Sequence, residues 1–341
     1  MIKLRNSLYV MNNAYIHKQN ETVLMEMTDE AGNKTKTKLP MHGIAHLHLF
    51  GYCTVSPYFM QMCAENNTTI SYYTPNGKFL ARCVGKSSGN VLLRQAQYKQ
   101  AEHTPLTIAQ HLITAKIRTS RAILQRHQRN HGKHSEVTKV IDRMAQIIEA
   151  IPAQNELEKL RGLEGEAASH YFGVFNHLLT RQTSELQLNR RTRRPPKDPI
   201  NAMLSFLYSV LGNEIAGALE GVGLDPQVGF LHRARPGRHS LALDLLEEFR
   251  GYIVDRTVIN LVNLQQVKAK DFTTDTVGGV VLKDETRKVL LKAYNARKLE
   301  EIVHPVLDEK IQIGLLPHCQ AMLLARHLRG DMQHYVPFFT R

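Results

Sequence analysis

The chain contains no tryptophan and only four cysteines among its 341 residues. No two of them have the CxxC spacing of a zinc knuckle or a redox pair. Scattered cysteines in a chain of this length are typical of reduced, buried small residues; they are Cys53, Cys63, Cys83 and Cys319. The first residues, MIKLR, lack the apolar core of a secretory signal, and neither a basic amphipathic anchor nor a long apolar span indicates a membrane surface. We therefore expect a cytoplasmic protein without a membrane partner.

What the chain does have is positive charge. Lysine and arginine outnumber aspartate and glutamate by 44 to 31, which gives a formal net charge of +13 and a sequence pI near 9.6. A surplus of this size sets up a positive surface potential that attracts polyanions. Hydrophobic residues make up 43% of the chain, enough for a sizeable core. A folded nucleic-acid-binding protein fits both numbers.

The periodicity changes near residue 89 and predicts two domains. Short strand-type runs separated by turn signals occupy the first part, with one short helix at 57–64; the strands are expected at 4–10, 14–17, 21–27, 35–39, 44–50, 69–73 and 79–84. From there on the period is helical, with helices expected at 91–100, 108–129, 137–150, 157–179, 200–219, 241–263, 285–299 and about 306–329. We therefore predict an α+β fold: a small antiparallel β-sandwich-like domain over residues 1–89, then a larger all-α domain over residues 90–341.

Glu164 breaks the pattern of its helix. The apolar stripe of this segment passes through Leu160, Ala167 and Tyr171, and position 164 falls on the same face. A carboxylate on a buried face costs several kcal/mol or more unless a cation or donors satisfy it. Two interpretations remain open, a core salt bridge with a nearby arginine and a metal ligand. Gly162 and Gly165 weaken the helix, which we interpret as room for another backbone to approach.

A second group of polar residues follows the apolar Phe230-Leu231 pair. His232 comes directly after it, and Asp244 and Glu247, three residues apart, share a face of a leucine-rich helix that Ser240 could cap. Alone, a histidine in such a place is more often structural than a ligand, and Glu248 and Arg250 indicate that the helix also meets solvent. Imidazole plus carboxylates without thiolates suits Mg²⁺ or Mn²⁺ better than structural zinc.

A third feature is an exposed basic segment before the helix at 200–219. Five cations stand within eight residues and are stiffened by two prolines, after which Asp198 caps the helix and Pro199 opens it. Such a run is often just a solvated loop, but arginines suit bidentate phosphate contacts. We predict contacts with the DNA backbone from this segment and from the loop before Ser240, through Arg190, Arg191, Arg193, Arg194, Lys197, Arg235 and Arg238.

These segments carry a resemblance that spans nearly the whole chain. The stretches RGLEGEAASHYF, RRPPKDPINAMLSFL, GLDPQVGFLH and SLALDLLEEFR, at 161–172, 193–207, 223–232 and 240–250, occur in the order typical of one family. In them the sequence resembles the CRISPR-associated integrase/endonuclease family, the universal first adaptation protein. The closing tail, ARHLRGDMQHYVPFFTR, and the overall length are most similar to its subtype I-C branch.

The resemblance implies a metal-dependent active site. The family's ligands are a glutamate of the EG motif, the histidine of the GFLH motif and an acid on the next helix, which correspond here to Glu164, His232 and Glu247, with Asp244 as a supporting acid. Many members have aspartate at the third position, so whether Asp244 or Glu247 leads stays open. The resemblance also implies a β-rich dimerisation domain, a homodimer, and a complex with the small second adaptation protein, which bridges two dimers.

We therefore predict a DNA integrase and endonuclease dependent on Mg²⁺ or Mn²⁺. It would insert short foreign DNA segments into a CRISPR repeat array, with a 3′-hydroxyl of the incoming double-stranded DNA attacking a phosphodiester. No protein nucleophile is then required, consistent with the lack of a Ser-His-Asp or Cys-His arrangement. Two alternatives stay open, a structure-selective DNA repair nuclease and a non-catalytic basic scaffold for nucleic acid.

Overall fold

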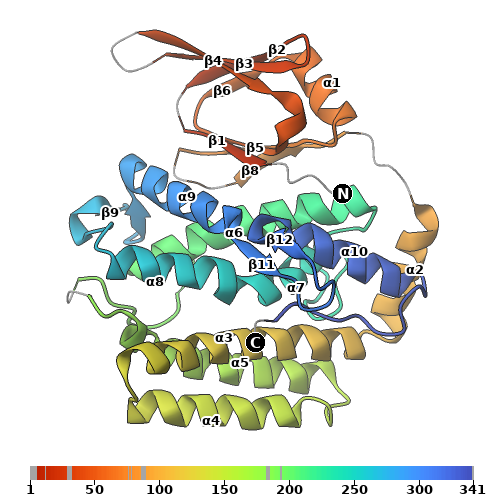
Figure 1. Ribbon diagram of the computed structural model, residues 1–341, viewed down its shortest axis with the longest axis vertical. Helices are drawn as coiled ribbons and strands as arrows, with labels where there is room; N and C mark the ends of the chain where they lie inside the picture. Colours follow the sequence, from red (N-terminus) through yellow and green to blue (C-terminus); the bar gives the residue numbers. More distant parts are fainter. Residues whose placement is uncertain are drawn as a thin grey trace. The chain divides into compact units, whose positions relative to one another are not determined.

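In a computed structural model, the chain divides into two compact units, Met1–Gly89 and Asn90–Arg341. The structure describes residues 6–11, 13–28, 33–75, 77, 79–85, 90–181, 185–192 and 194–339. The first unit is built on strands and the second on helices, so the predicted α+β class is confirmed (Figure 1).

The first unit consists of two four-stranded sheets, with orders β4-β3-β2-β6 and β1-β5-β7-β8. Apolar side chains from both sheets and from α1 form its core, including Ile16, Leu47 and Phe59, all fully buried. Its elements are β1 Asn6–Val10, β2 Ala14–Gln19, β3 Thr22–Thr28, β4 Lys34–Pro40, β5 Ile44–Phe50, β6 Cys53–Val55, α1 Pro57–Glu65, β7 Thr69–Tyr73 and β8 Phe79–Cys83.

The expected antiparallel arrangement is wrong for part of this unit. β1 pairs with β5, β5 with β7, and β2 with β6 in parallel, while β2–β3, β3–β4 and β7–β8 are antiparallel. A tight turn can join only antiparallel neighbours, whereas a parallel pair needs a longer crossover. The crossover from β5 to β7 contains α1. The period-two pattern of a strand does not indicate which other strand it pairs with.

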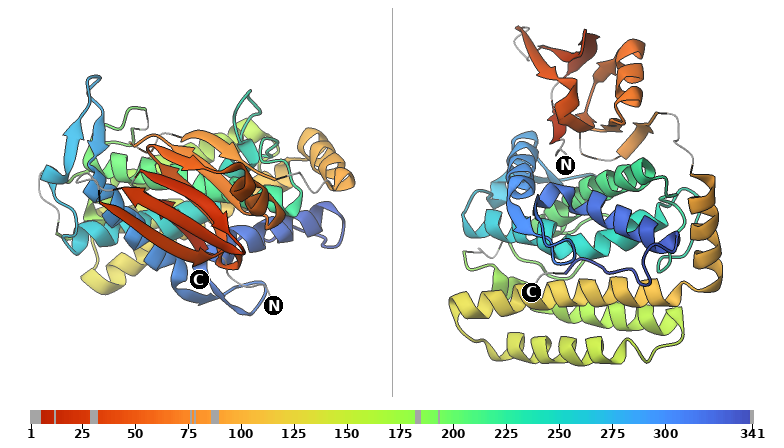
Figure 2. Two further views of the ribbon diagram at one scale, coloured as in Figure 1. Left: turned by 90° about the horizontal axis from the view of Figure 1, so that it is seen from above. Right: turned by 45° about the vertical axis from the view of Figure 1, so that its right-hand side comes forward.

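The second unit is mainly helical. Its long elements are α2 Val91–His103, α3 Leu106–His131, α4 Ser135–Ala150, α5 Leu157–Gly173, α6 Pro199–Val222, α7 Ser240–Phe249, α8 Arg256–Asn263, α9 Asp284–Leu299 and α10 Leu316–Leu328. α3 packs against α4, α5 and α7. The helices α3, α4 and α5 lie side by side (Figure 2). Between α7 and α8 the backbone widens into a π-helical turn, η3, Arg250–Asp255.

Three expectations for this unit need correction. The predicted helix at 157–179 ends at Gly173 and is followed by a short 3₁₀ turn, η2, Phe175–Leu178. The last helix begins at Leu316 instead of near residue 306. The unit also contains two ribbons, β9 Phe272–Thr274 with β10 Val280–Leu282 and β11 Glu301–Val303 with β12 Lys310–Gln312. Strands of three residues are too short to show alternation, so the reading of this unit as entirely helical missed them.

α6 is the central helix. Asp198 caps it as predicted, accepting a hydrogen bond from the Asn201 backbone N–H at 2.8 Å, and Pro199 stands in its first turn. Among the described helices it alone is long and apolar enough to cross a membrane, and 56% of its most apolar stretch is buried inside the protein. It packs against α7, α9 and α10. A buried core helix shows the same composition as a membrane span.

Candidate active site

Three helices bring two glutamates and a lysine together. Glu164 comes from α5, Glu247 from α7, and Lys116 from the apolar face of α3 that packs against both. The Lys116 ammonium contacts Glu164 Oε1 and lies 2.7 Å from Glu247 Oε2. The side chains of Lys116 and Glu247 are only 7% and 8% exposed, whereas that of Glu164 is 26% exposed. The two carboxylates therefore converge on a single positive charge at a site with one open side.

Arg250 holds Glu247 from the other side. Its guanidinium donates to both carboxylate oxygens, at 3.1 and 3.0 Å. Burial raises the pKa of Glu247, but the charges of Arg250, Lys116 and His232 together outweigh it and hold the pKa well below its ordinary value. Glu247 is thus a buried carboxylate that stays ionised at neutral pH.

Asp244 has a different task from Glu247. Its Oδ2 accepts the backbone N–H groups of Phe230 and Leu231, at 2.6 and 2.9 Å. Its Oδ1 accepts both the backbone N–H and the ring Nδ1–H of His232, at 2.9 and 2.6 Å. A proton on Nδ1 leaves the lone pair on Nε2, the pattern by which a carboxylate orients a metal-binding imidazole. A Cβ at Gly229 would come within 2.6 Å of Asp244 Oδ2, so this approach requires glycine.

The segment that carries His232 is fixed from two further directions. The buried amide of Gln97, on α2, donates to the carbonyls of Asp225 and Val228, both at 2.8 Å, and accepts the Asp225 N–H at 2.9 Å. Arg161, on α5, donates its Nε–H to the carbonyl of Leu231 at 2.9 Å. The histidine is therefore held by its backbone as well as by its ring.

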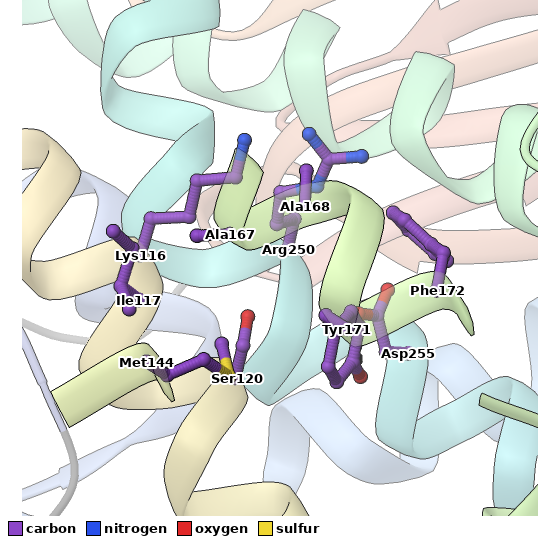
Figure 3. Close-up of a pocket in the computed structure, with 10 residues that line it drawn as sticks. All are labelled: Lys116, Ile117, Ser120, Met144, Ala167, Ala168, Tyr171, Phe172, Arg250 and Asp255. Carbon is purple, nitrogen blue, oxygen red and sulfur yellow. Dashed lines mark hydrogen bonds between the residues drawn. The ribbon is translucent and has the colours of Figure 1, made fainter. Parts of the chain in front are cut away.

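A buried polar network lies next to the carboxylates. The Arg250 guanidinium is 4.4 Å from the centre of the Tyr208 ring, and Tyr171 and Tyr208 both donate hydroxyl hydrogen bonds to Asp255, the former at 3.1 Å. In Figure 3, Lys116 and Arg250 line one pocket with their charged ends toward the same side, and Tyr171 lies beside Asp255. Arg250 and Asp255 are the two ends of the π-helical turn, so this turn sets their spacing.

Sequence reasoning missed Lys116, Arg161 and Gln97 as members of the site. Lys116 had the same signal that identified Glu164, since it stands among Leu112, Ile113 and Ile117 on the apolar face of α3. A buried lysine on one helix and a buried acid on another predict each other. Nothing local in the sequence marks Arg161 or Gln97, whose partners are carbonyl groups 70 or more residues away.

Three expectations about this region are wrong. A Cβ at Gly162 or Gly165 would meet no atom within 4 Å, so no backbone approaches these glycines among the described residues. Ser240 does not cap α7: it is the first helical residue, and its hydroxyl donates to the Arg233 carbonyl at 3.0 Å, which closes the loop between them. Arg250 does not meet solvent, because it is 7% exposed and paired with Glu247.

The residues predicted to contact DNA fall into different environments. Arg190, Arg194 and Arg235 are exposed, and Arg238 is half-buried. Lys197 is also exposed, with its ammonium donating to the Gly278 carbonyl at 3.1 Å. Arg193 lies outside the described residues.

Arg191 departs from its neighbours. Its guanidinium donates to Asn201 Oδ1 at 2.6 Å and to the Ser205 hydroxyl at 3.3 Å, and it lies 5.4 Å from the centre of the Tyr208 ring. These contacts turn it inward onto α6. The structure therefore gives Arg191 a packing role in place of the solvent-facing one expected from the charge run.

The donor types suit a divalent cation, although among the described residues the ligand atoms of Glu164, His232 and Glu247 do not all lie within 4.8 Å of one another. Two carboxylates already converge on one cationic group, the Lys116 ammonium, and the bond between Nδ1 and Asp244 leaves Nε2 as the other ring nitrogen of His232. One nitrogen and two carboxylates form a mixed set of the kind that suits Mg²⁺ or Mn²⁺. Asp244 itself has both oxygens filled by four hydrogen bonds, so it supports the histidine instead of competing with Glu247.

The fold belongs to a class seen in several solved structures. The chain superimposes on a CAS1 protein from Thermotoga maritima with a TM-score of 0.81 at 22% identity, covering 98% of this chain and all of that one. A casposase bound to an integration product gives a TM-score of 0.85 at 21% identity, covering 99% and 95% of the two chains.

Sequence comparison narrows this class to one family. The profile of the family described as CRISPR associated protein Cas1 matches residues 8–296. The chain is 45% identical over 349 residues to CRISPR-associated endonuclease Cas1 2 of Rhodospirillum rubrum. It is 42% identical over 347 residues to CRISPR-associated endonuclease Cas1 1 of Chlorobaculum tepidum, and both alignments cover each chain completely. The chain belongs to the Cas1 family, as its motifs predicted.

Proposed function

We propose that this chain is a divalent-metal-dependent DNA integrase and endonuclease that inserts short foreign DNA segments into a CRISPR repeat array. One observation carries the proposal: the carboxylates of Glu164 and Glu247 converge on a single cation beside His232, whose ring is oriented by Asp244. The endonuclease names of full-length relatives and the casposase with its integration product support the same reaction class.

In this proposal Glu164, His232 and Glu247 hold Mg²⁺ or Mn²⁺, which supplies a Lewis acid that polarises a phosphoryl oxygen. The 3′-hydroxyl of the incoming DNA loses its proton and attacks the target phosphorus. A new P–O bond forms while the bond to the 3′-oxygen of the target strand breaks, and that oxygen leaves as a hydroxyl. Water in place of the 3′-hydroxyl gives hydrolysis by the same displacement. Asp244 acts as a positioning residue, because its contacts are to the loop and ring of His232.

We assign DNA backbone contacts to the exposed cations of the basic segment and of the loop before Ser240. Arg190, Arg194, Lys197 and Arg235 present charge to solvent, in a chain whose net charge is +13. We also keep Arg193 and Arg238 as proposed DNA contacts, because they belong to the same two basic segments of the sequence. Arg191 leaves the set, because its hydrogen bonds go to α6.

The assembly is also a proposal. Residues 1–89 form a dimerisation domain and residues 90–341 the catalytic domain of a cytoplasmic homodimer, and a small second adaptation protein bridges two such dimers on double-stranded DNA. A Cas6-RT-Cas1–Cas2 complex contains a chain of similar fold, with a TM-score of 0.79 over 99% of this chain. We place the protein in the subtype I-C branch on its closing tail and overall length. Whether a reading frame for a small companion protein adjoins its gene tests the proposed assembly.

Strand transfer with substituted ligands tests the proposal. Glu164→Ala and His232→Ala should each lower Mn²⁺-dependent joining of DNA ends to a repeat duplex by at least about 10²-fold, because each removes a ligand. Glu166→Ala is the matched control: it lies on the same helix but pairs with Arg143 at the surface, at 2.7 Å, and should leave joining unchanged.

The same assay separates the alternatives. Full activity of Glu164→Ala and insensitivity to EDTA would instead indicate a non-catalytic scaffold. Cleavage of branched DNA that is faster than joining to repeat DNA, and lost in the same variants, would indicate a repair nuclease with this metal site.

A further inference from the structure

A second group of imidazoles lies at the far end of α3 from Lys116. His134 precedes α4, Glu136 is in the first turn of α4, and His177 is in η2. Their ligand atoms all lie within 4.8 Å of one another, with His177 Nε2 3.1 Å from Glu136 Oε2 and the two imidazole rings 4.0 Å apart. At 1.5 Å per helical residue, the end of α3 is roughly 20 Å from Lys116. The group is therefore separate from the proposed active site.

We propose that His134, Glu136 and His177 form a second metal site, selective for Zn²⁺ and similar transition-metal ions. Two imidazole nitrogens and one carboxylate are a three-ligand set that zinc accepts, with water as the fourth ligand. Tetrahedral bonds of 2.0–2.1 Å place ligand atoms about 3.4 Å apart, so the site must close by about 1 Å. His134 and Glu136 are exposed and can make this adjustment by rotation of their side chains.

The segments that carry the two histidines are already held. The His134 carbonyl accepts three hydrogen bonds, from Gln128 Nε2 and from the backbone and hydroxyl of Thr138, at 3.1, 2.9 and 3.0 Å. His177 stands between Phe175 and Leu178, which are 0% and 1% exposed. Only side-chain freedom is lost on binding, which favours tight coordination.

The surroundings also favour a transition metal over Mg²⁺. Two further histidines on the last turns of α3, His127 and His131, stack with ring centres 4.7 Å apart. Burial, followed by the nearby His131 and His177, lowers the pKa of His127, so its imidazole is neutral at physiological pH. Imidazole nitrogen suits Zn²⁺, Ni²⁺ or Cu²⁺, whereas Mg²⁺ prefers oxygen ligands.

A metal at this place would join two segments distant in sequence. His134 and Glu136 belong to the α3–α4 connection, and His177 lies next to Asn176, whose side chain pairs with the backbone of Leu188 at 3.0 and 2.9 Å. Leu188 directly precedes the basic segment. Coordination would therefore stabilise both the helical hairpin and the start of that segment.

Zinc binding to the full-length protein tests the site. The probe is Zn²⁺ measured by calorimetry in excess Mg²⁺, with Co²⁺ absorption in the visible range as a report of the ligand geometry. The wild type should bind one Zn²⁺ more than His177→Ala and one more than His134→Ala. His103→Ala, a change at an exposed histidine on α2, should bind as the wild type does. At about a hundredfold excess over the dissociation constant, Zn²⁺ should raise Tm by about 5 °C in the wild type and the control only.

Two other outcomes of the zinc-binding experiment are possible, and each would contradict the proposal. Equal Zn²⁺ stoichiometry and affinity in wild type, His134→Ala and His177→Ala would place the bound ion elsewhere. Loss of the extra Zn²⁺ in His232→Ala but not in His134→Ala would show zinc entering the proposed active site. His134 is exposed, so its substitution should not disturb folding, and this keeps the test decisive even if His177→Ala is unstable.

Discussion

Glu247 and Glu248 are neighbours on α7, both buried, yet they lie in regions of opposite character. Glu247 faces the cations Lys116 and Arg250, at 2.7 and 3.0 Å. Among the described residues, the hydrogen-bond partners of Glu248 are neutral donors: the Tyr335 hydroxyl, the Gln320 amide at 3.0 Å and the Phe338 backbone N–H at 2.7 Å.

The difference in partners reverses the charge state. Burial raises the pKa of both groups, but the cations bring that of Glu247 well below its ordinary value. Burial raises the pKa of Glu248 to about 8, which its neutral donors do not offset. At neutral pH Glu247 is therefore the ionised carboxylate of the two. Glu248 instead anchors the C-terminal tail, and the expectation that it marks a solvent-facing side of α7 is wrong.

The largest expected effect is a difference in strand-transfer activity between substitutions at Glu247 and at Glu248. Glu247→Gln keeps the shape of the side chain but removes its charge, and should lower Mn²⁺-dependent strand transfer by at least about 10²-fold. Glu248→Gln should leave the rate within about threefold, because the amide oxygen can accept the two hydrogen bonds made to Oε2 and the amide nitrogen can donate to the Tyr335 hydroxyl oxygen. Similar losses in both variants would show that the charge state does not distinguish the two positions.

A smaller effect is expected on the free energy of unfolding, which should depend on pH through Glu248. Glu248 has an ordinary pKa of 4.5 and a folded pKa of about 8, so the folded state binds the extra proton between these values. Its contribution to stability is fully present below 4.5 and is lost as pH rises through 8. Between about pH 5.5 and about pH 7.5 the wild type should lose up to about 2.7 kcal/mol relative to Glu248→Gln, as measured by urea unfolding. A pH-independent difference would contradict the raised pKa.

The smallest effect extends the comparison from acids to cations. Arg194 is exposed, whereas Arg191 donates into α6. Arg194→Ala should reduce the salt slope of DNA binding by roughly one while leaving stability unchanged. Arg191→Ala should leave the slope unchanged and lower the free energy of unfolding by about 1–3 kcal/mol, because buried acceptors lose their donor. An exchange of these two outcomes would overturn the placement of both residues.

The sequence predicts most helices and the position of Glu164, since helical periodicity and a misplaced charge are local signals. The same reasoning, applied to α3, would have identified Lys116. The bond between His232 and Asp244 is not predictable in this way, because an irregular loop brings the two together. The parallel strand pairs escape for a similar reason: strand pairing is decided by chain segments far apart in sequence.

The different roles of Asp244 and Glu247 also could not be predicted from the sequence. Both acids lie on one face of α7, one turn apart, and both are buried. Only the direction of the neighbouring N–H groups distinguishes them, and those groups belong to the backbone of residues 230–232. Backbone donors have no sequence signature, so the motif left the leading acid open.

In the π-helical turn Arg250–Asp255, the number of residues determines the local geometry of the backbone. All six residues are buried, and a Cβ on Gly251 would lie 3.2 Å from both Ile123 and Thr119. A π turn is a helix with one extra residue, and each residue rotates an α-helix by about 100°. Removal of one residue would therefore let this turn close as an α-helical one, with α8 kept in its present orientation, and would shorten the spacing of Arg250 and Asp255 by one residue. The extra residue therefore sets the distance along the chain between two buried charged groups, the Arg250 guanidinium and the Asp255 carboxylate.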